Sequence, residues 1–197
     1  MRIVLRDNPA LFDSALFQLR DDYLDLLERF EESFDKDEIE RGRALEALAC
    51  CLLQGIKCFH PQPDIKTRTN QIDVLVVVRR LYREDPFLSV FNTCFVCECK
   101  NERRKVSVRE VHQFAQLMRK RSDSPVGIIF SRLPLSGGPT RDAILAQREL
   151  RLREELYVLN VCHEDLVSIA EGKNFLTLLR SKYVELVVDA LRPIELM

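Results

Sequence analysis

The sequence predicts an α/β domain in which one mixed β-sheet is covered by helices on both faces. Apolar runs typical of buried strands lie at 91–100 and 126–131, and a single amphipathic helix over 107–121 separates them. A crossover helix between two buried strands indicates a right-handed, parallel βαβ unit. Before this unit, strands at 56–60 and 71–79 follow one another without a helix between them, which makes the sheet mixed. A chain of 197 residues is long enough for one well-buried domain.

Two helices are expected at the N-terminus. The apolar residues within 10–33 have helical spacing, and the outer face of this helix is acidic. We expect residues 1–36 to form a helical addition that packs on a single domain spanning 37–197. A second helix over 38–54 carries Glu46 beside its apolar stripe rather than opposite it, so this carboxylate can lean toward the sheet.

The remaining elements follow in chain order. The short strand at 56–60 precedes a proline-containing segment at 61–64, and the charged connector over 79–86 is compatible with a long hairpin. After residue 131 the pattern predicts four elements: a helix over 140–155, a strand over 156–161, a short helix from 164 and a long helix over 174–191.

Charge is distributed unevenly, although the formal net charge is only −1. Residues 1–48 carry 13 acidic and 7 basic residues, whereas residues 100–121 carry 8 basic and 2 acidic residues. Such a basic block indicates either a solvated helix face or a surface for a polyanion.

No apolar run reaches the roughly 20 residues that cross a bilayer, so no membrane partner is expected. Cysteines in apolar stretches behave as small hydrophobes, which favours reduced thiols in the cytoplasm.

Two charged residues lie at the end of an apolar strand in the segment 95–101. Glu98 and Lys100 should point to one face of this strand, and Cys97 and Cys99 to the other. Burying a carboxylate and an ammonium group costs free energy unless each finds a partner, and a divalent cation is one such partner. Asp73, near the start of the preceding apolar strand, is the best candidate to share that site.

Four residues in this order resemble the active-site positions of the PD-(D/E)xK nuclease superfamily, and within it the Mrr-like restriction endonucleases: Glu46, Asp73, Glu98 and Lys100. In that family a Glu-bearing helix precedes a hydrophobic strand with an Asp near its start, then the (D/E)xK strand, then a helix with a Gln, for which Gln113 is the match. The nearby Pro63–Asp64 pair has no hydrophobic strand behind it and is not taken as the motif. The resemblance covers residues 38–132 and implies the restriction-endonuclease-like three-layer fold, with a central mixed β-sheet flanked by helices.

The resemblance implies a metal-dependent endonuclease that hydrolyses phosphodiester bonds of DNA, in restriction, defence or DNA processing. Mg²⁺, for which Mn²⁺ can substitute, would be bound by Asp73, Glu98 and the backbone carbonyl of Cys99. Glu46 would hold a second metal ion or a metal-bound water.

Lys100 would orient or deprotonate the attacking water and stabilise the developing charge. Gln113 would orient Lys100 or contact a phosphate. Further basic and amide side chains are expected to contact phosphates: Arg103, Arg104, Lys105, Arg109, Gln116, Arg119 and Lys120.

Three alternatives stay open. Glu98 and Lys100 could form a simple ion pair at a strand end. The chain could be a catalytically inactive module of the same fold that binds nucleic acid, although the intact Asp, Glu and Lys favour an enzyme. It could also be an interaction subunit whose acidic N-terminal helix docks a larger nuclease or ATPase.

For a nuclease we expect a homodimer, because cutting both strands of a duplex needs two active sites or two events.

Overall fold

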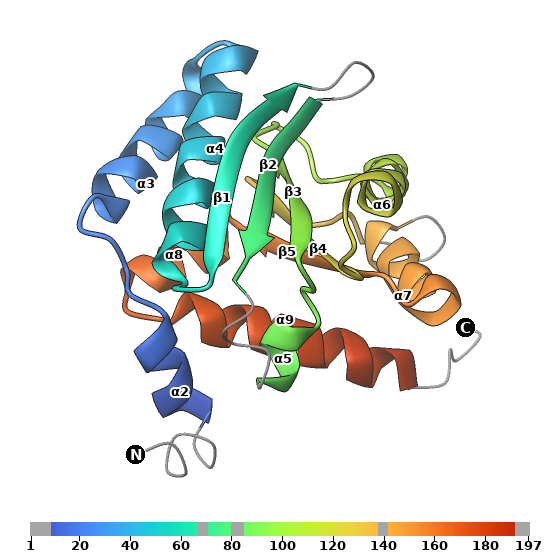
Figure 1. Ribbon diagram of the computed structural model, residues 1–197. Coiled ribbons are helices and arrows are strands. Elements are labelled where there is room, and N and C mark those ends of the chain that lie inside the picture. The colour runs from blue at the N-terminus through green and yellow to red at the C-terminus, as the bar shows by residue number, and fades with distance from the viewer. Residues whose placement is uncertain (1–8, 67–70, 80–84, 138–141, 192–197) are drawn as a thin grey trace.

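In the computed structural model, a five-stranded mixed sheet lies between two layers of helices (Figure 1). The structure describes residues 9–66, 71–79, 85–137 and 142–191. The strands are β1 (Phe59–Lys66), β2 (Gln71–Val78), β3 (Cys94–Lys100), β4 (Val126–Ser131) and β5 (Tyr157–Cys162), and they are adjacent in chain order. The first two pairings are antiparallel and the last two are parallel. This confirms the mixed sheet and the parallel unit formed by β3, α6 (Val108–Arg121) and β4.

Strand β1 differs from the expectation, because the prolines predicted to follow a short strand lie inside it. The backbone N–H of Arg79 donates to the carbonyl of Cys58 at 2.9 Å, so alternate residues from Cys58 onward direct their backbone groups toward β2. Pro61 and Pro63 fall at the intervening positions, which face the open edge of the sheet. A proline is tolerated there because no N–H is needed for the ladder. The earlier part of the expected strand, residues 56–58, lies outside β1.

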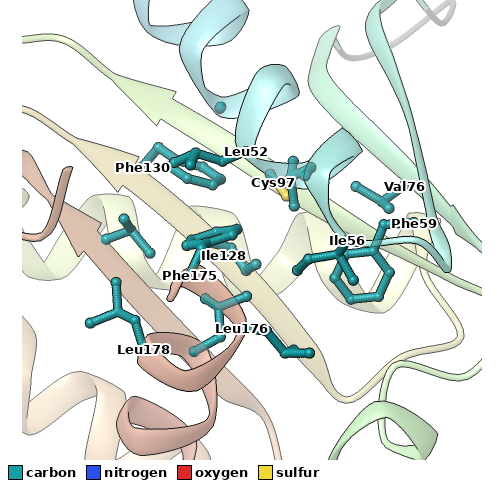
Figure 2. Packing of buried hydrophobic residues seen from close by; sticks show 14 of the residues in the cluster. Leu52, Ile56, Phe59, Val76, Cys97, Ile128, Phe130, Phe175, Leu176 and Leu178 are labelled. Atoms are coloured by element: carbon teal, nitrogen blue, oxygen red, sulfur yellow. The ribbon is translucent and has the colours of Figure 1, made fainter. Parts of the chain in front are cut away.

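One face of the sheet is covered by α4 (Glu38–Gly55), α8 (His163–Ala170) and α9 (Phe175–Leu191). We call the apolar cluster beneath them the α4-side core. Figure 2 shows Leu52 of α4 and Phe175 of α9 in the same cluster as Cys97 and Phe130 of the strands. These side chains are buried, and their removal from water is the main force that joins the helices to the sheet.

The other face is covered by α6 and α7 (Ala143–Glu154), over a second apolar cluster that we call the α6-side core (Figure 1). Val96 and Ile129 of the strands pack there against Phe114 and Met118 of α6. Gly127 permits the close approach of α6 to β4, because a Cβ atom at this position would lie 2.8 Å from Met118 Sδ and from Phe114 Cζ. The prediction of helices on both faces is therefore confirmed.

The N-terminal region was expected to be one helix over 10–33, and this is wrong. It contains α2 (Pro9–Leu16), α3 (Tyr23–Glu32) and the short 3₁₀ helix η1 (Ser33–Asp35). Between α2 and α3 the chain bridges to the segment after α4: Phe17 pairs with Ile56, and the N–H of Gln18 donates to the carbonyl of Gly55 at 3.0 Å. This long-range pairing replaces the helical hydrogen bonds that the local periodicity predicts.

Both N-terminal helices contribute to the domain packing. Tyr23 and Phe30 of α3 are fully buried in the α4-side core, and the Tyr23 hydroxyl donates to the carbonyl of Leu166 at 2.8 Å. Asp13 of α2 is buried and pairs with Arg180 of α9 at 2.7 Å. The same guanidinium pairs at 3.2 Å with Asp85, the N-cap of the short helix α5 (Pro86–Ser89). Within the described ranges, no helix is long and apolar enough to cross a membrane.

Candidate active site

The candidate site lies at a fork between β2 and β3. Their antiparallel ladder runs from Val77–Cys94 to Val74–Cys97, and the next residues along it are Asp73 and Glu98. At this point the Asp73 carboxylate replaces the backbone as an acceptor, because its Oδ2 receives the N–H of Cys99 at 2.7 Å. Two carboxylates therefore stand at neighbouring positions where the strands separate.

The backbone at Cys99 is also turned into the fork. The N–H and carbonyl of a residue in a strand point to the same side. Since the Cys99 N–H points to Asp73, its carbonyl points toward β2 as well. The next carbonyl, of Lys100, faces β4 and accepts the N–H of Arg132 at 3.1 Å. The Cys99 carbonyl is thus directed into the fork, on the same side as Asp73.

Glu98 and Lys100 share the α6 side of β3, as their spacing predicts. Lys100 Nζ lies 2.7 Å from Glu98 Oε1, and both side chains are largely buried. They form one wall of a cleft of about 320 Å³. The cleft is lined by Gln71, Glu98, Lys100, Glu110, Gln113, Phe114, Gln116, Leu117 and Lys120. Helix α6 therefore brings the predicted Gln113, Gln116 and Lys120 to the same hollow as the Glu-x-Lys pair.

Two more carboxylates lie near the fork. Glu46 is half-buried on α4. Asp64 and Asp73 stand between the Pro63–Val74 and Ile65–Ile72 partners of the β1–β2 register. Burial raises the pKa of Glu46, and the charges of Asp64 and Glu98 raise it further, while Arg43 lowers it. Glu46 is thus close enough to both carboxylates for their charges to affect its ionisation.

The carboxylates of the fork itself are also harder to ionise than usual. Burial raises the pKa of Asp73, and Glu46 and Asp64 add to this effect, against the lowering effect of the Cys99 N–H and of Lys100. Burial and the charge of Asp73 raise the pKa of Glu98, and Lys100 opposes them. The fork is therefore a region of excess, partly desolvated negative charge, which a cation would relieve.

The start of α6 is fixed beside the cleft by Glu110. Its carboxylate accepts hydrogen bonds from the N–H of Ser107 at 2.8 Å and from Arg104 at 2.7 Å, and Ser107 caps the helix in return. Burial alone would raise the pKa of Glu110, but the bonds from Arg104 and Ser107 lower it to about 2. This arrangement connects the segment after Lys100 to the helix that carries Gln113.

The predicted phosphate contacts divide into two groups. Three arginines already have acidic partners: Arg103 lies 3.8 Å from Asp35, Arg104 pairs with Glu110, and Arg119 pairs with Glu154. Lys105, Arg109 and Lys120 are exposed, and none has an ion-pair partner in the described part of the chain. The second group is better placed to bind an external anion.

Sequence reasoning missed two residues of the site. Asp64 was set aside because no hydrophobic strand follows it. The antiparallel pairing of β1 with β2 brings it close enough to Asp73 for its charge to raise the pKa of Asp73. The available signal was the short separation between the two segments, which allows a hairpin. Glu110 was not singled out, although Ser107 and Glu110 have the spacing of a capping box.

No protein-family model, curated protein or solved structure matches the chain. The structure itself shows an α/β fold with a five-stranded mixed sheet flanked by helices.

Proposed function

We propose that the protein is a metal-dependent endonuclease that hydrolyses phosphodiester bonds of DNA, with a restriction-endonuclease-like fold. One observation carries the proposal: Asp73 and Glu98 stand at neighbouring positions of a strand fork, with Lys100 bonded to Glu98. The order of elements supports it, since α4 with Glu46, β2 with Asp73, β3 with Glu-x-Lys and α6 with Gln113 follow the order of the PD-(D/E)xK family.

The residues at the fork fit a magnesium ion. Asp73 Oδ2 and Glu98 Oε1 are engaged by protein donors, whereas the second oxygen of each carboxylate has no protein donor among the described residues. The described ranges contain no group of three or more His, Cys, Asp or Glu side chains placed to hold a metal ion. Mg²⁺ needs only one or two carboxylates, because it keeps several of its waters. Bound there, it would neutralise charge that develops on the phosphate.

The surroundings of Lys100 favour one of its two expected roles. Burial alone would lower the pKa of Lys100, but the charge of Glu98, with Asp73 and Glu110, raises it. A lysine with a raised pKa stays protonated at neutral pH, so it orients water and stabilises negative charge rather than accepting a proton. Gln113 lines the same cleft and would hold a phosphate oxygen or a water there.

The proposal is tested by cleavage of plasmid and oligonucleotide DNA with Mg²⁺ or Mn²⁺. We expect Asp73→Asn and Lys100→Ala to lower the rate by about 10²-fold or more, because each removes a group that acts on the reacting phosphate. Glu149→Gln serves as the control, since it removes a partly exposed carboxylate on the outer side of α7. Cutting that survives both site substitutions, or a wild type that binds DNA and never cuts it with either metal, would overturn the proposal.

A further inference from the structure

Two arginines, Arg41 and Arg132, lie at the end of the sheet next to the fork. Arg132 directly follows β4, and its N–H donates to the carbonyl of Lys100 at 3.1 Å. Lys100 and Ser131 are partners in the parallel register, so Arg132 is one residue beyond the strand position opposite Lys100. The Lys100 side chain lies on the α6 side of the sheet, whereas that of Arg132 lies on the α3 side, against Phe30.

Among the described residues, the Arg132 guanidinium donates only to neutral acceptors. Nε donates to Asn101 Oδ1 at 2.7 Å, and Nη2 donates to the carbonyl of Phe30 and, at 3.5 Å, to Ser33 Oγ. The group also lies 4.2 Å from the ring centroid of Phe30. Glu31 is an acidic residue whose charge reaches Arg132, but its carboxylate is bonded to His163 at 2.9 Å. Among the described residues, Arg132 therefore has no carboxylate partner.

Arg41, in the first turns of α4, is in a similar state. Its Nη1 donates to the carbonyl of Lys36 at 3.1 Å, and its Nε is buried with no hydrogen-bond partner within the described residues. Asn101 connects the Arg41 backbone to the Arg132 side chain, because its side chain donates to the backbone carbonyl of Arg41 at 2.8 Å and accepts from Arg132 Nε. Burial lowers the pKa of Arg132, and the nearby charge of Arg41 lowers it further.

Several other arginines have a carboxylate partner within the chain. Arg104, Arg148 and Arg180 each pair with a carboxylate at 3.0 Å or less. Two guanidinium groups that act on each other electrostatically and lack such a partner would be stabilised by an anion that contacts both. A planar guanidinium suits phosphate oxygens in particular, since it offers parallel N–H donors.

We propose that Arg41 and Arg132 bind a backbone phosphate of the nucleic-acid strand that passes Lys100, with Asn101 connecting the Arg41 backbone to the Arg132 guanidinium. This inference rests on the proposed function, because it takes the strand to be the substrate. A nucleic-acid strand carries a phosphate about every 3.4 Å along the axis, so a strand held at Lys100 brings further phosphates to the adjacent edge. The N-terminal helices then take part in substrate binding, since α3 and η1 position Arg132 through Phe30 and Ser33.

The test is binding of fluorescein-labelled single-stranded and duplex DNA, followed by anisotropy in EDTA over a range of KCl concentrations. Arg41→Gln removes one guanidinium with little loss of internal bonding, and Arg132→Lys keeps the charge but loses the planar fork. We expect each variant to bind DNA roughly three- to tenfold more weakly. For Arg41→Gln, the slope of log K against log salt should fall by about one, the value of one lost phosphate contact.

Arg153→Gln is the matched control, because this side chain is 76% exposed and lies at the far end of α7. Folding of each variant is checked by thermal melting. Unchanged affinity and unchanged salt slope in a folded Arg41→Gln variant would overturn the inference. So would a result in which inorganic phosphate raises the melting temperature through Arg41 while DNA affinity is unaffected, since the site would then take free phosphate.

The binding assay and the cleavage assay together separate this inference from the proposed function. A wild type that binds DNA through these arginines but never cuts it supports the anion site and refutes the nuclease proposal. A wild type that cuts DNA, with Arg41→Gln and Arg132→Lys equal to it in affinity, refutes the anion site and leaves the nuclease proposal standing.

Discussion

Replacing Glu110 by glutamine should cost stability, and the loss should depend on pH. The side chain is buried, with 9% of the residue exposed, and it receives charge-assisted hydrogen bonds from Arg104 and a backbone bond from Ser107. Burial alone would raise the pKa of Glu110, but these bonds lower it from 4.5 to about 2. Glutamine keeps an acceptor for Ser107 and loses the ion pair with Arg104.

The magnitude follows from the pKa of Glu110. A fall of the Glu110 pKa from 4.5 to about 2 corresponds to ~3.4 kcal/mol of stability. The Arg104 side chain is 58% exposed, so solvent screens the pair and we expect a loss of about 2 kcal/mol at neutral pH. Because the folded pKa lies below the unfolded value, this stability is complete above about pH 5 and is lost as the pH falls toward 2.

Urea denaturation of the wild type and Glu110→Gln at about pH 7 and about pH 3.5 measures the effect. The difference in free energy of unfolding should shrink by about 1 kcal/mol at the lower pH, where the unfolded wild type takes up a proton. Glu149→Gln, whose carboxylate lies 3.9 Å from Arg153, should change stability by less than about 0.5 kcal/mol. A difference that is the same at both pH values would show that the charge of Glu110 is not the cause.

Three further predictions concern the fork, the sheet and the N-terminus. Asp73→Asn should raise the melting temperature in EDTA, because burial raises the pKa of Asp73 and its ionisation opposes folding; this gain should shrink as the pH falls and Asp73 becomes protonated. Gly127→Ala should lower the free energy of unfolding by about 1–3 kcal/mol, measured by urea denaturation, since the alanine Cβ atom would collide with Met118 and Phe114. Deletion of residues 1–36 should abolish the cooperative thermal transition seen by near-UV circular dichroism, since Tyr23 and Phe30 are fully buried; a cooperative transition in the shortened chain would contradict this.

Most of the regular elements could be predicted from local pattern. The strand at 126–131 and the helix from 38 were predicted to within a residue, because a strand buried on both faces and a strongly periodic helix carry clear signals. The prediction of one continuous N-terminal helix was wrong at Phe17. There the chain forms a bridge to Ile56, a residue 39 positions away. Local periodicity contains no information about such a partner.

The candidate site was predictable only in part, for a similar reason. Glu98 and Lys100 could be placed on one face because strand alternation is a local property. The position of Asp64 depends on the register of β1 against β2. The link between the Arg41 backbone and the Arg132 side chain depends on Asn101, which is hydrogen-bonded to both. These contacts become visible only when the sheet and its first covering helix are assembled.

Under the proposed function, the stability of the sheet and the binding of a metal ion would be opposed at the fork. Like charges at facing positions of an antiparallel pair destabilise it, and Asp73 and Glu98 stand where such a pair would be. A sheet built for stability alone would place apolar or oppositely charged residues there. Lys100 and the Cys99 N–H each engage one carboxylate oxygen, and the second oxygen of each carboxylate has no donor among the described residues. Under the proposed function, these second oxygens would bind the metal ion. If Asp73→Asn is at once more stable in EDTA and unable to cut DNA, the two results together point to metal binding, because a purely structural carboxylate would lose stability when it is replaced.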